Sequence, residues 1–370
     1  MDAGRIRGGT GTGPGKRGKM PDRPVSALWV KPPMITRLTA DRQACAWQTA
    51  LAQAITDPEV LIRRLNLDPA LLPAARVAAQ RFRLQVPESY VARMRPGNLH
   101  DPLLRQVLPM ESELEAAPGF VEDPVGDLDA MAAPGVIQKY AGRALLITTG
   151  ACAIHCRYCF RRHYPYGQAS AGRSRWPETL AWLRSRPDIH EVILSGGDPL
   201  VLTDGELAAM TRDLARIDHL RTLRVHTRLP VILPERIGPD LIDWLTGTRL
   251  RPVMVIHANH AQELDTSTRS ALATLDRTGV RLFNQAVLLR GVNDSVAALG
   301  DLGEVLFASG VQPYYLHVLD PVSGAAHFAV EEAAALAIMK ALAAQQPGYL
   351  LPRLVREIPG APGKSPVTGT

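Results

Sequence analysis

Residues 143–160, RALLITTGACAIHCRYCF, decide the fold, because a short β-branched run leads directly into three closely spaced cysteines. The run 143–149 is typical of a buried strand, and Gly150 marks the start of a loop. Five more runs of this kind follow, at 190–195, 222–227, 252–257, 280–288 and 313–318. Segments with helical periodicity lie between or after them, at 203–216, 239–246, 262–277, 295–307 and 330–345.

Strands and helices that alternate at intervals of roughly 25–45 residues indicate a parallel sheet with right-handed crossovers. Six units fall short of a complete eight-stranded barrel. The sequence therefore predicts an α/β fold, a partial (β/α)6 TIM-like barrel, with an open doubly-wound sheet as the alternative. Ligands of either architecture bind at the C-terminal ends of the strands. Polar residues stand at those ends: Thr148, Ser195, His226, His257, Gln285 and His317.

The barrel is expected over residues 136–345, and three other segments flank it. Residues 1–33 hold seven Lys or Arg, two Asp and many glycines without apolar periodicity, which predicts a disordered basic tail. Residues 34–135 predict a helical region, because apolar side chains recur at helical spacing between 40 and 96, with Cys45 as one small buried member. Residues 346–370 are rich in Gly and Pro and predict an extended C-terminal segment.

The composition excludes several classes of protein. With 370 residues, 46% of them hydrophobic, the chain can bury a large core. Its net charge of +6 belongs mostly to the tail, since the other 337 residues carry 35 basic and 34 acidic groups. No apolar run approaches the ~18 residues of a membrane span, and no signal peptide is visible. Three of the four cysteines are clustered, which suggests a metal or redox site in a reducing cytoplasm.

Cys152, Cys156 and Cys159 have the spacing C-x3-C-x2-C on the loop after the first strand. Three thiolates can each bind one iron of a cubane cluster and leave the fourth iron open for a ligand. One alternative is a Cys3His zinc site that uses His155 or His163. The other is a chance cluster of core thiols, which the loop position and the flanking arginines disfavour.

The same motif is the signature of the radical S-adenosylmethionine (SAM) superfamily, which this sequence resembles. Ser195-Gly196-Gly197-Asp198-Pro199 ends the second predicted strand, in the position of that superfamily's glycine-rich SAM-binding element. Glycines leave the backbone amides and carbonyls accessible to the methionine group of SAM. The resemblance implies a [4Fe-4S] cluster and SAM as cofactors.

A second resemblance explains a late lysine, Lys364, in the segment EIPGAPGKSP. A lone lysine in a Gly/Pro-rich segment is usually solvated, and this GKS lacks the first glycine and the helix of a phosphate-binding loop. From about residue 95 onward, however, the chain resembles the lysine 2,3-aminomutase family. The matching blocks are KYAGRALLITT, CRYCFRRH, SGGDPL, RLPVILPERI, NQAVLLRGVND and PYYLHVLDPVSGAAHF. In that family a lysine at the position of Lys364 forms a Schiff base with pyridoxal 5'-phosphate (PLP).

The resemblance implies a role for each matching residue. The cluster ligands would be Cys152, Cys156 and Cys159. SAM would contact Ser195, His257 and Gln285, in a pocket shaped by Gly196, Gly197 and Asp198. PLP would be held by Lys364, Tyr140 and Arg143. The substrate's α-carboxylate would bind Arg161, and its ε-ammonium would bind Asp320 and Glu357.

The implied reaction moves the amino group of L-α-lysine from Cα to Cβ, with an electron donor to reduce the cluster. The end at Thr370 and Glu357 in place of the more usual Asp differ from the free-standing catabolic enzymes of the family. The sequence most resembles the branch that makes (R)-β-lysine for a ligase that modifies elongation factor P. A catabolic lysine 2,3-aminomutase is the alternative enzyme. A zinc-bearing RNA-binding protein is disfavoured by the missing fourth thiol and the neutral body. We expect no nucleic-acid or membrane partner.

Overall fold

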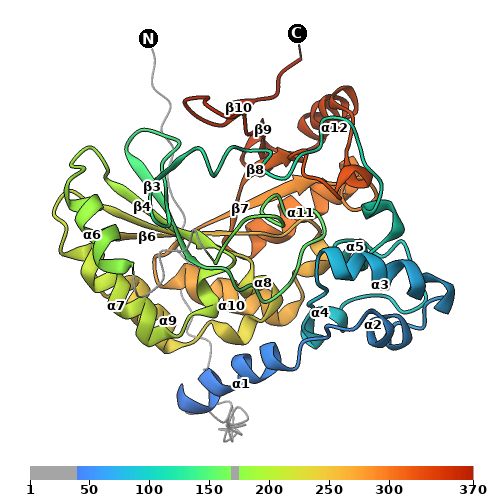
Figure 1. Ribbon diagram of the computed structural model, residues 1–370, viewed down its shortest axis with the longest axis horizontal. Helices are drawn as coiled ribbons and strands as arrows, with labels where there is room; N and C mark the ends of the chain where they lie inside the picture. Colours follow the sequence, from blue (N-terminus) through green and yellow to red (C-terminus); the bar gives the residue numbers. More distant parts are fainter. Residues whose placement is uncertain (1–39, 168–174, 370) are drawn as a thin grey trace, which may run out of the picture. The chain divides into compact units, whose positions relative to one another are not determined.

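Seven parallel strands form the centre of the structure, and they lie side by side in the order in which they follow along the chain (Figure 1). They are β3 (Arg143–Thr149), β4 (Glu191–Gly196), β5 (Thr222–Thr227), β6 (Arg251–Ile256), β7 (Arg281–Leu288), β8 (Gln312–Val318) and β9 (Arg353–Arg356). The computed structural model describes residues 40–167 and 175–369. The predicted basic tail, 1–33, lies outside these residues.

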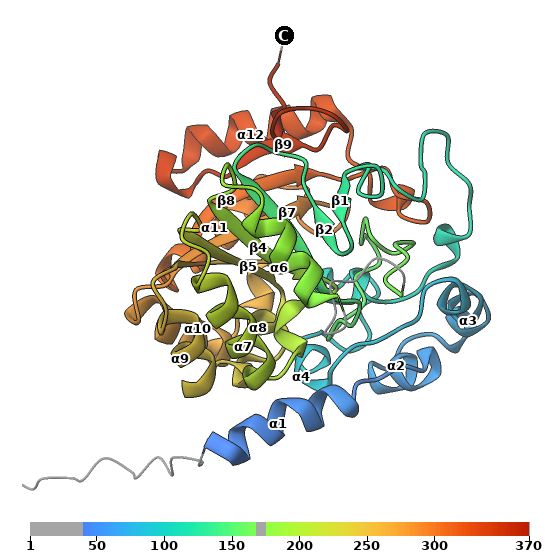
Figure 2. The same ribbon diagram turned by 60° about the vertical axis from the view of Figure 1, so that its left-hand side comes forward.

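Helices connect the strands and lie on the outer side of the curved sheet (Figures 1 and 2). They are α6 (Trp176–Arg184), α7 (Asp204–Ala215), α8 (Leu229–Ile232), α9 (Pro239–Thr246), α10 (Thr266–Arg277), α11 (Val296–Ala308) and α12 (Glu332–Gln345). A doubly-wound sheet would reverse its strand order, and this sheet does not. The two end strands of the sheet do not pair with each other within the described residues. The partial barrel that the sequence predicts is therefore confirmed.

The six predicted strands agree with the structure to within one residue at each end. Helix α7 starts where predicted, because Thr203 and Glu206 form a capping box at its N-terminus. Helix α10 begins later than the predicted residue 262. The Asp265 side chain accepts from the backbone N–H of Thr268, which caps the helix there, and residues 261–263 form a separate 3-10 turn.

Both edges of the sheet contain strands that the sequence did not reveal. Within the predicted extended segment, β9 pairs in parallel with β8, and β10 (Ser365–Pro366) pairs antiparallel with β9. At the opposite edge, β1 (Met131–Ala133) and β2 (Val136–Ile137) form a small hairpin, and β2 pairs antiparallel with β3. The final residues of the described chain are thus built into the sheet.

The N-terminal region is helical as predicted, up to about residue 105. Its helices are α1 (Ala40–Ala52), α2 (Pro58–Arg64), α3 (Leu72–Arg81), α4 (Glu88–Val91) and α5 (Pro102–Arg105). One apolar core extends from Leu61 of α2 through the barrel to Leu342 of α12, so helical region and barrel form one unit. The Cys45 side chain lies outside the described part of α1. Among the described helices, none has the length and apolar character that crossing a membrane requires.

Candidate active site

A cavity of about 300 Å³ lies within the curve of the sheet, and every site residue predicted from the sequence lines it. These residues are Tyr140, Arg143, Cys152, Cys156, Cys159, Arg161, Ser195, Gly196, Gly197, Asp198, His257, Gln285, Asp320, Glu357 and Lys364. The polar residues at the ends of strands line it as well, with one exception. Thr148 is buried between strands, where its hydroxyl donates to the Ser195 carbonyl at 3.0 Å.

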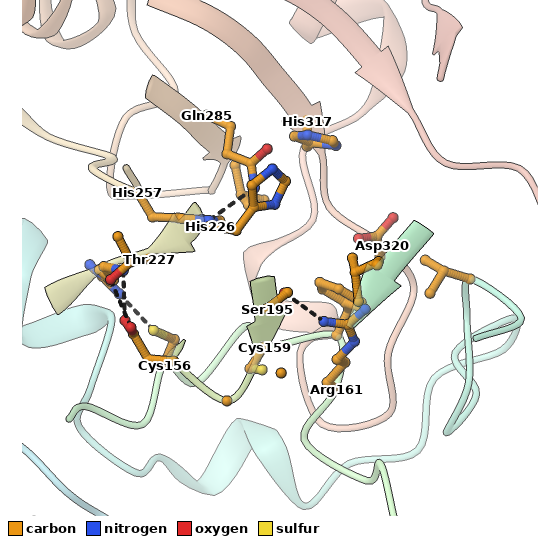
Figure 3. A pocket seen from close by; sticks show the side chains of 18 of the residues that line it. Cys156, Cys159, Arg161, Ser195, His226, Thr227, His257, Gln285, His317 and Asp320 are labelled. Atoms are coloured by element: carbon orange, nitrogen blue, oxygen red, sulfur yellow. Dashed lines mark hydrogen bonds between the residues drawn. The ribbon is translucent and has the colours of Figure 1, made fainter. Parts of the chain in front are cut away.

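Strand alternation turns polar side chains toward this cavity. Along β5, Leu223 and Val225 are fully buried, whereas the intervening Arg224 and His226 line the cavity. Successive side chains of a strand point to opposite faces, so one face packs under the helices while the other faces the ligand space. Figure 3 shows His226, His257, Gln285 and His317 entering the cavity in this way. The Nε2 atoms of His226 and His317 are buried and have no hydrogen-bond partner in the part of the chain that the structure describes.

The three cysteines lie together on the loop between β3 and α6. The Gln85 amide holds this loop by donating to the Cys152 carbonyl at 2.7 Å. Burial, with the neighbouring cysteines, raises the pKa of Cys152 well above its usual value and that of Cys159 to about 11. A bound cationic metal group would reverse this effect, because it stabilises thiolates.

Both histidines of the zinc alternative lie against backbone carbonyls. Among the described residues, no three His, Cys, Asp or Glu side chains converge on one metal position. His155 Nδ1 lies 2.8 Å from the Arg83 carbonyl, and His163 Nε2 lies 3.2 Å from the Ser323 carbonyl. Cysteines that each bind a different iron of a cluster need not converge on a single point.

Arginines that flank the cysteines anchor the loop. Arg157 and Arg162 both pair with the buried Glu113 carboxylate, at 2.5 and 2.8 Å. Arg161 instead enters the cavity, where its Nε donates to Asp127 at 2.6 Å and its Nη1 donates to the Ser195 hydroxyl at 3.2 Å (Figure 3). Part of the Arg161 guanidinium is therefore already engaged by the protein.

The glycines of the SGGDP segment allow two loops to touch. Gly196 has φ of +128°, and a Cβ on Gly197 would lie 2.2 Å from the Ala151 carbonyl oxygen. Backbone hydrogen bonds join the loops, from Gly197 N to Thr149 O at 2.7 Å and from Asp198 N to Ala151 O at 2.8 Å. Only glycine fits these positions, so the segment lies directly against the cysteine loop.

Asp198 joins the ends of β4 and β5. Its carboxylate accepts from the Thr227 hydroxyl at 2.7 Å and from the backbone amides of Arg228 and Leu229 at 2.7 and 3.1 Å. Farther along the sheet, the side chains of His257 and Gln285 are joined by a hydrogen bond of 2.9 Å. Burial lowers the pKa of His257 to about 3, so its ring is neutral.

A row of alternating charges runs along the other side of the cavity. Lys364 Nζ donates to Glu357 at 2.6 Å, and the Tyr140 hydroxyl donates to the same carboxylate at 2.7 Å. Lys139 Nζ lies 3.4 Å from Glu357 and 2.6 Å from Asp127. Burial acts to raise the pKa values of both carboxyls, but the adjoining cations lower them below their usual values. Sequence reasoning missed Asp127 and Lys139.

Within the described residues, two groups beside this row have no hydrogen-bond or ion-pair partner for their charge. Asp320 has no side-chain hydrogen bond or ion pair within the described residues, and burial raises its pKa to about 7. Arg143 stacks on the Tyr140 ring, with its Cζ 4.8 Å from the ring centre, and its buried Nε is unpartnered. The cavity thus offers one open site for a cation and one for an anion.

Comparison with known proteins assigns the family. The chain is 47% identical over 322 residues to the L-lysine 2,3-aminomutase of Escherichia coli (strain K12), a match that covers 87% of this chain and 94% of the relative. It is 43% identical over 324 residues to the Haemophilus influenzae L-lysine 2,3-aminomutase, covering 88% and 96%. The enzyme of the same name from Clostridium subterminale is 32% identical over 324 residues, covering 87% and 77%.

The chain was also compared with models of protein families and with solved structures. No model of a known protein family matches the chain. A solved structure of Streptococcus suis SuiB bound to S-adenosylmethionine aligns with a TM-score of 0.43 and 11% identity, over 60% of this chain and 51% of SuiB. Because relatives at 47% and 43% identity are matched over nearly their whole lengths, the chain belongs to the L-lysine 2,3-aminomutase family and is an isomerase.

Proposed function

We propose that the protein is a radical SAM, PLP-dependent aminomutase that converts L-α-lysine to (R)-β-lysine for modification of elongation factor P. One observation carries the proposal. A single cavity brings together three cysteine thiols, a loop with two glycines and a lysine paired with a carboxylate, although Cys152 and Lys364 lie at opposite ends of the barrel sequence. We further propose that it works in the cytoplasm, where thiols stay reduced.

The cysteine loop fits an iron–sulfur cluster, and its neighbour fits SAM. Three thiols with no fourth cysteine among the cavity residues suit a cluster that keeps one iron open. Gly196 and Gly197 line the same cavity and have no side chains to cover their backbone. Ser195 precedes them in the sequence, and the hydrogen-bonded pair His257 and Gln285 also lines the cavity. This juxtaposition supports the roles that the sequence resemblance implies for them.

The Lys364 side of the cavity fits PLP. The Lys364 amine is held by Glu357, while Arg143 supplies a partly buried cationic group whose Nε is an unused donor among the described residues, as a phosphate or other anion requires. When bound, the cluster and SAM would supply radical hydrogen abstraction, and PLP would hold the migrating amino group.

Asp320 and Glu357 suit a substrate with a terminal ammonium. Asp320 is the open carboxylate, since Glu357 is held by Lys364, Lys139 and Tyr140. Loss of the positive charge on Lys364 would release one oxygen of Glu357 for the substrate ammonium. A glutamate substrate would place a third negative charge here, so the pair favours lysine.

Arg161 remains our candidate for the substrate's α-carboxylate. Its Nε is occupied by Asp127, so a carboxylate would have to bind the remaining Nη protons. Asp127 then acts as a positioning residue that holds the guanidinium toward the cavity. This second contact is one that the sequence did not indicate.

The branch assignment rests on the sequence resemblance alone, because the relatives do not distinguish the branches by name. Those at 47%, 43% and 41% identity and the Clostridium subterminale relative at 32% are all named L-lysine 2,3-aminomutase. The proposed transfer of the product to elongation factor P comes from the sequence resemblance.

The test is anaerobic incubation of the reconstituted full chain with a reductant, SAM, PLP and L-lysine, followed by chiral analysis of the product. We expect (R)-β-lysine, and we expect its ligase to attach it to elongation factor P with the corresponding mass increase. A protein that holds cluster and PLP yet makes no β-lysine would refute the aminomutase proposal. Formation of (S)-β-lysine would instead favour the catabolic alternative.

A further inference from the structure

Arg228 follows β5 and contacts one of the cysteine sulfurs directly. Its Nη1 donates to Cys156 Sγ at 2.7 Å and lies 2.8 Å from the Tyr158 hydroxyl. The side chain is only 7% exposed, so water does not compete for this hydrogen bond. A charge-assisted contact in a buried setting is stronger than the same contact at the surface.

The rest of the Arg228 side chain is fixed on the far side from the cavity. Its Nη2 donates to Glu263 at 2.7 Å and to the side-chain amide oxygen of Gln106, Oε1, at 2.6 Å. Its backbone amide is held by Asp198. The guanidinium therefore bridges the cysteine sulfur and a buried carboxylate, and it cannot rotate away without breaking several hydrogen bonds.

Glu263 is the matching negative charge, and it has no other role in the cavity. Its side chain is completely buried, and its second oxygen accepts from the backbone amides of Asn259 and His260 at 2.8 and 3.1 Å. It does not line the cavity, unlike Arg228. The positive group thus lies against the sulfur, and the negative group lies one contact farther away.

We propose that Arg228 is a positioning residue that sets the reduction potential of the cluster through Cys156, with Glu263 as the opposing charge. The inference rests on the cluster site of the proposed function. Reduction adds one electron to the cluster, and a hydrogen bond and positive charge at a ligand sulfur stabilise that added charge. Arg228 therefore raises the potential, and Glu263 lowers it.

The opposite signs separate this role from a purely structural one. If the network only held the loops together, loss of either partner would lower cluster content or shift the potential in the same direction. A charge effect instead predicts a rise in the potential on losing Glu263 and a fall on losing Arg228. The second substitution is best made where Glu263 is already neutral, because a buried carboxylate left unpaired would be strongly destabilising.

The experiment measures the midpoint potential of the reconstituted full chain by EPR-monitored redox titration, without lysine or PLP. The proteins are wild type, Glu263→Gln, and Glu263→Gln combined with Arg228→Gln, each with its iron and sulfide content determined. We expect Glu263→Gln to raise the potential. We expect the added Arg228→Gln to lower it again by about a tenfold change in the reduced-to-oxidised ratio, equivalent to about 59 mV for one electron.

Equal potentials in clusters of equal iron content, or a double variant whose potential is not below that of Glu263→Gln, would overturn the inference. Should the double variant fail to hold iron, Glu263→Gln alone decides, since a potential at or below that of wild type contradicts the proposal. A wild-type protein that forms no cluster at all would instead refute the proposed function.

Discussion

Asp320 is a buried carboxyl whose charge depends on what binds beside it. Its pKa is raised to about 7, and only the ionised form attracts a substrate ammonium. We therefore expect the KM for lysine to rise as the pH falls through about 7, because protonation removes the negative charge. Above that pH the carboxylate is ionised, and the KM for lysine no longer changes with its protonation. Steady-state kinetics between pH 6 and 9 measure this dependence.

Replacing Asp320 tests the same contact without changing the pH. We expect Asp320→Asn to weaken lysine binding roughly 10- to 100-fold, the size of a lost hydrogen bond to a charged group, and to flatten the pH dependence. The iron–sulfur spectrum should not change. The exposed Asp218 provides a matched control as Asp218→Asn. If Asp320→Asn has the kinetics of wild type, Asp320 does not bind the substrate ammonium.

Lys364 and Lys139 are two amines on the same carboxylate, and only one is proposed to bond to PLP. We expect borohydride reduction of the PLP-loaded enzyme to label Lys364, and Lys364→Ala to abolish both the reduced adduct and turnover. The exposed Lys340 serves as the control, and Lys340→Ala should retain both. Peptide mapping by mass spectrometry identifies the labelled residue. An adduct that moves to Lys139, or persists in Lys364→Ala with turnover, contradicts the assignment.

The loops after β3 and β4 behave as one element, because their backbones meet at Gly197. A methyl group there would lie 2.2 Å from the Ala151 carbonyl oxygen, so Gly197→Ala must push the cysteine loop away. We expect a loss of about 1–3 kcal/mol of stability, together with weaker SAM binding and reduced iron retention. Urea unfolding and equilibrium binding measure these effects.

Gly205 is the matched control for that substitution. It lies in the first turn of α7, where an added Cβ meets nothing within 4 Å. Gly205→Ala should leave SAM binding unchanged and stabilise the protein by up to about 1 kcal/mol, since alanine favours helices. Equal behaviour of the two variants would show that close approach of the loops is unimportant.

Elements with a strong periodic pattern could be predicted from the sequence, and weakly patterned ones could not. The strands β3 to β8 carry a strong apolar pattern, continuous in β4 and alternating in β5 and β7, which explains the close prediction of their positions. β9 has only Leu354 and Val355 buried between two arginines. The β1–β2 hairpin has three strand residues before its turn and two after it. Such short edge strands depend on pairing with neighbours and leave little local signal.

The same distinction applies to the site. Cys152 and Lys364 belong to motifs with recognisable spacing, and the resemblance to a family placed them at once. Asp127 and Lys139 lie outside the long strands and helices, on connections with no periodic pattern, so nothing in the sequence marked them. They are apparent only when folding brings them beside Arg161 and Glu357.

Across the whole molecule, most of the excess positive charge lies in residues 1–33. Beyond residue 33 the chain has 35 basic and 34 acidic groups, so its body is nearly neutral. We expect a chain that begins at residue 34 to keep the kcat and KM of the full chain for lysine. The comparison is made on the two purified, reconstituted proteins at equal iron content. A large fall in turnover would assign residues 1–33 a role that the sequence does not suggest.

Strand β9 also has a consequence for biosynthesis. Glu357 and Lys364 emerge from the ribosome about two hundred residues after the cysteine loop, and they reach the cavity only when β9 pairs with β8. A nascent chain in which β3 to β8 have already assembled thus has its thiols in place while the amine side of the cavity is still missing. The proposed reaction on lysine would therefore have to wait until the seventh parallel strand has docked, because only then does the cavity contain both the thiols and the amine.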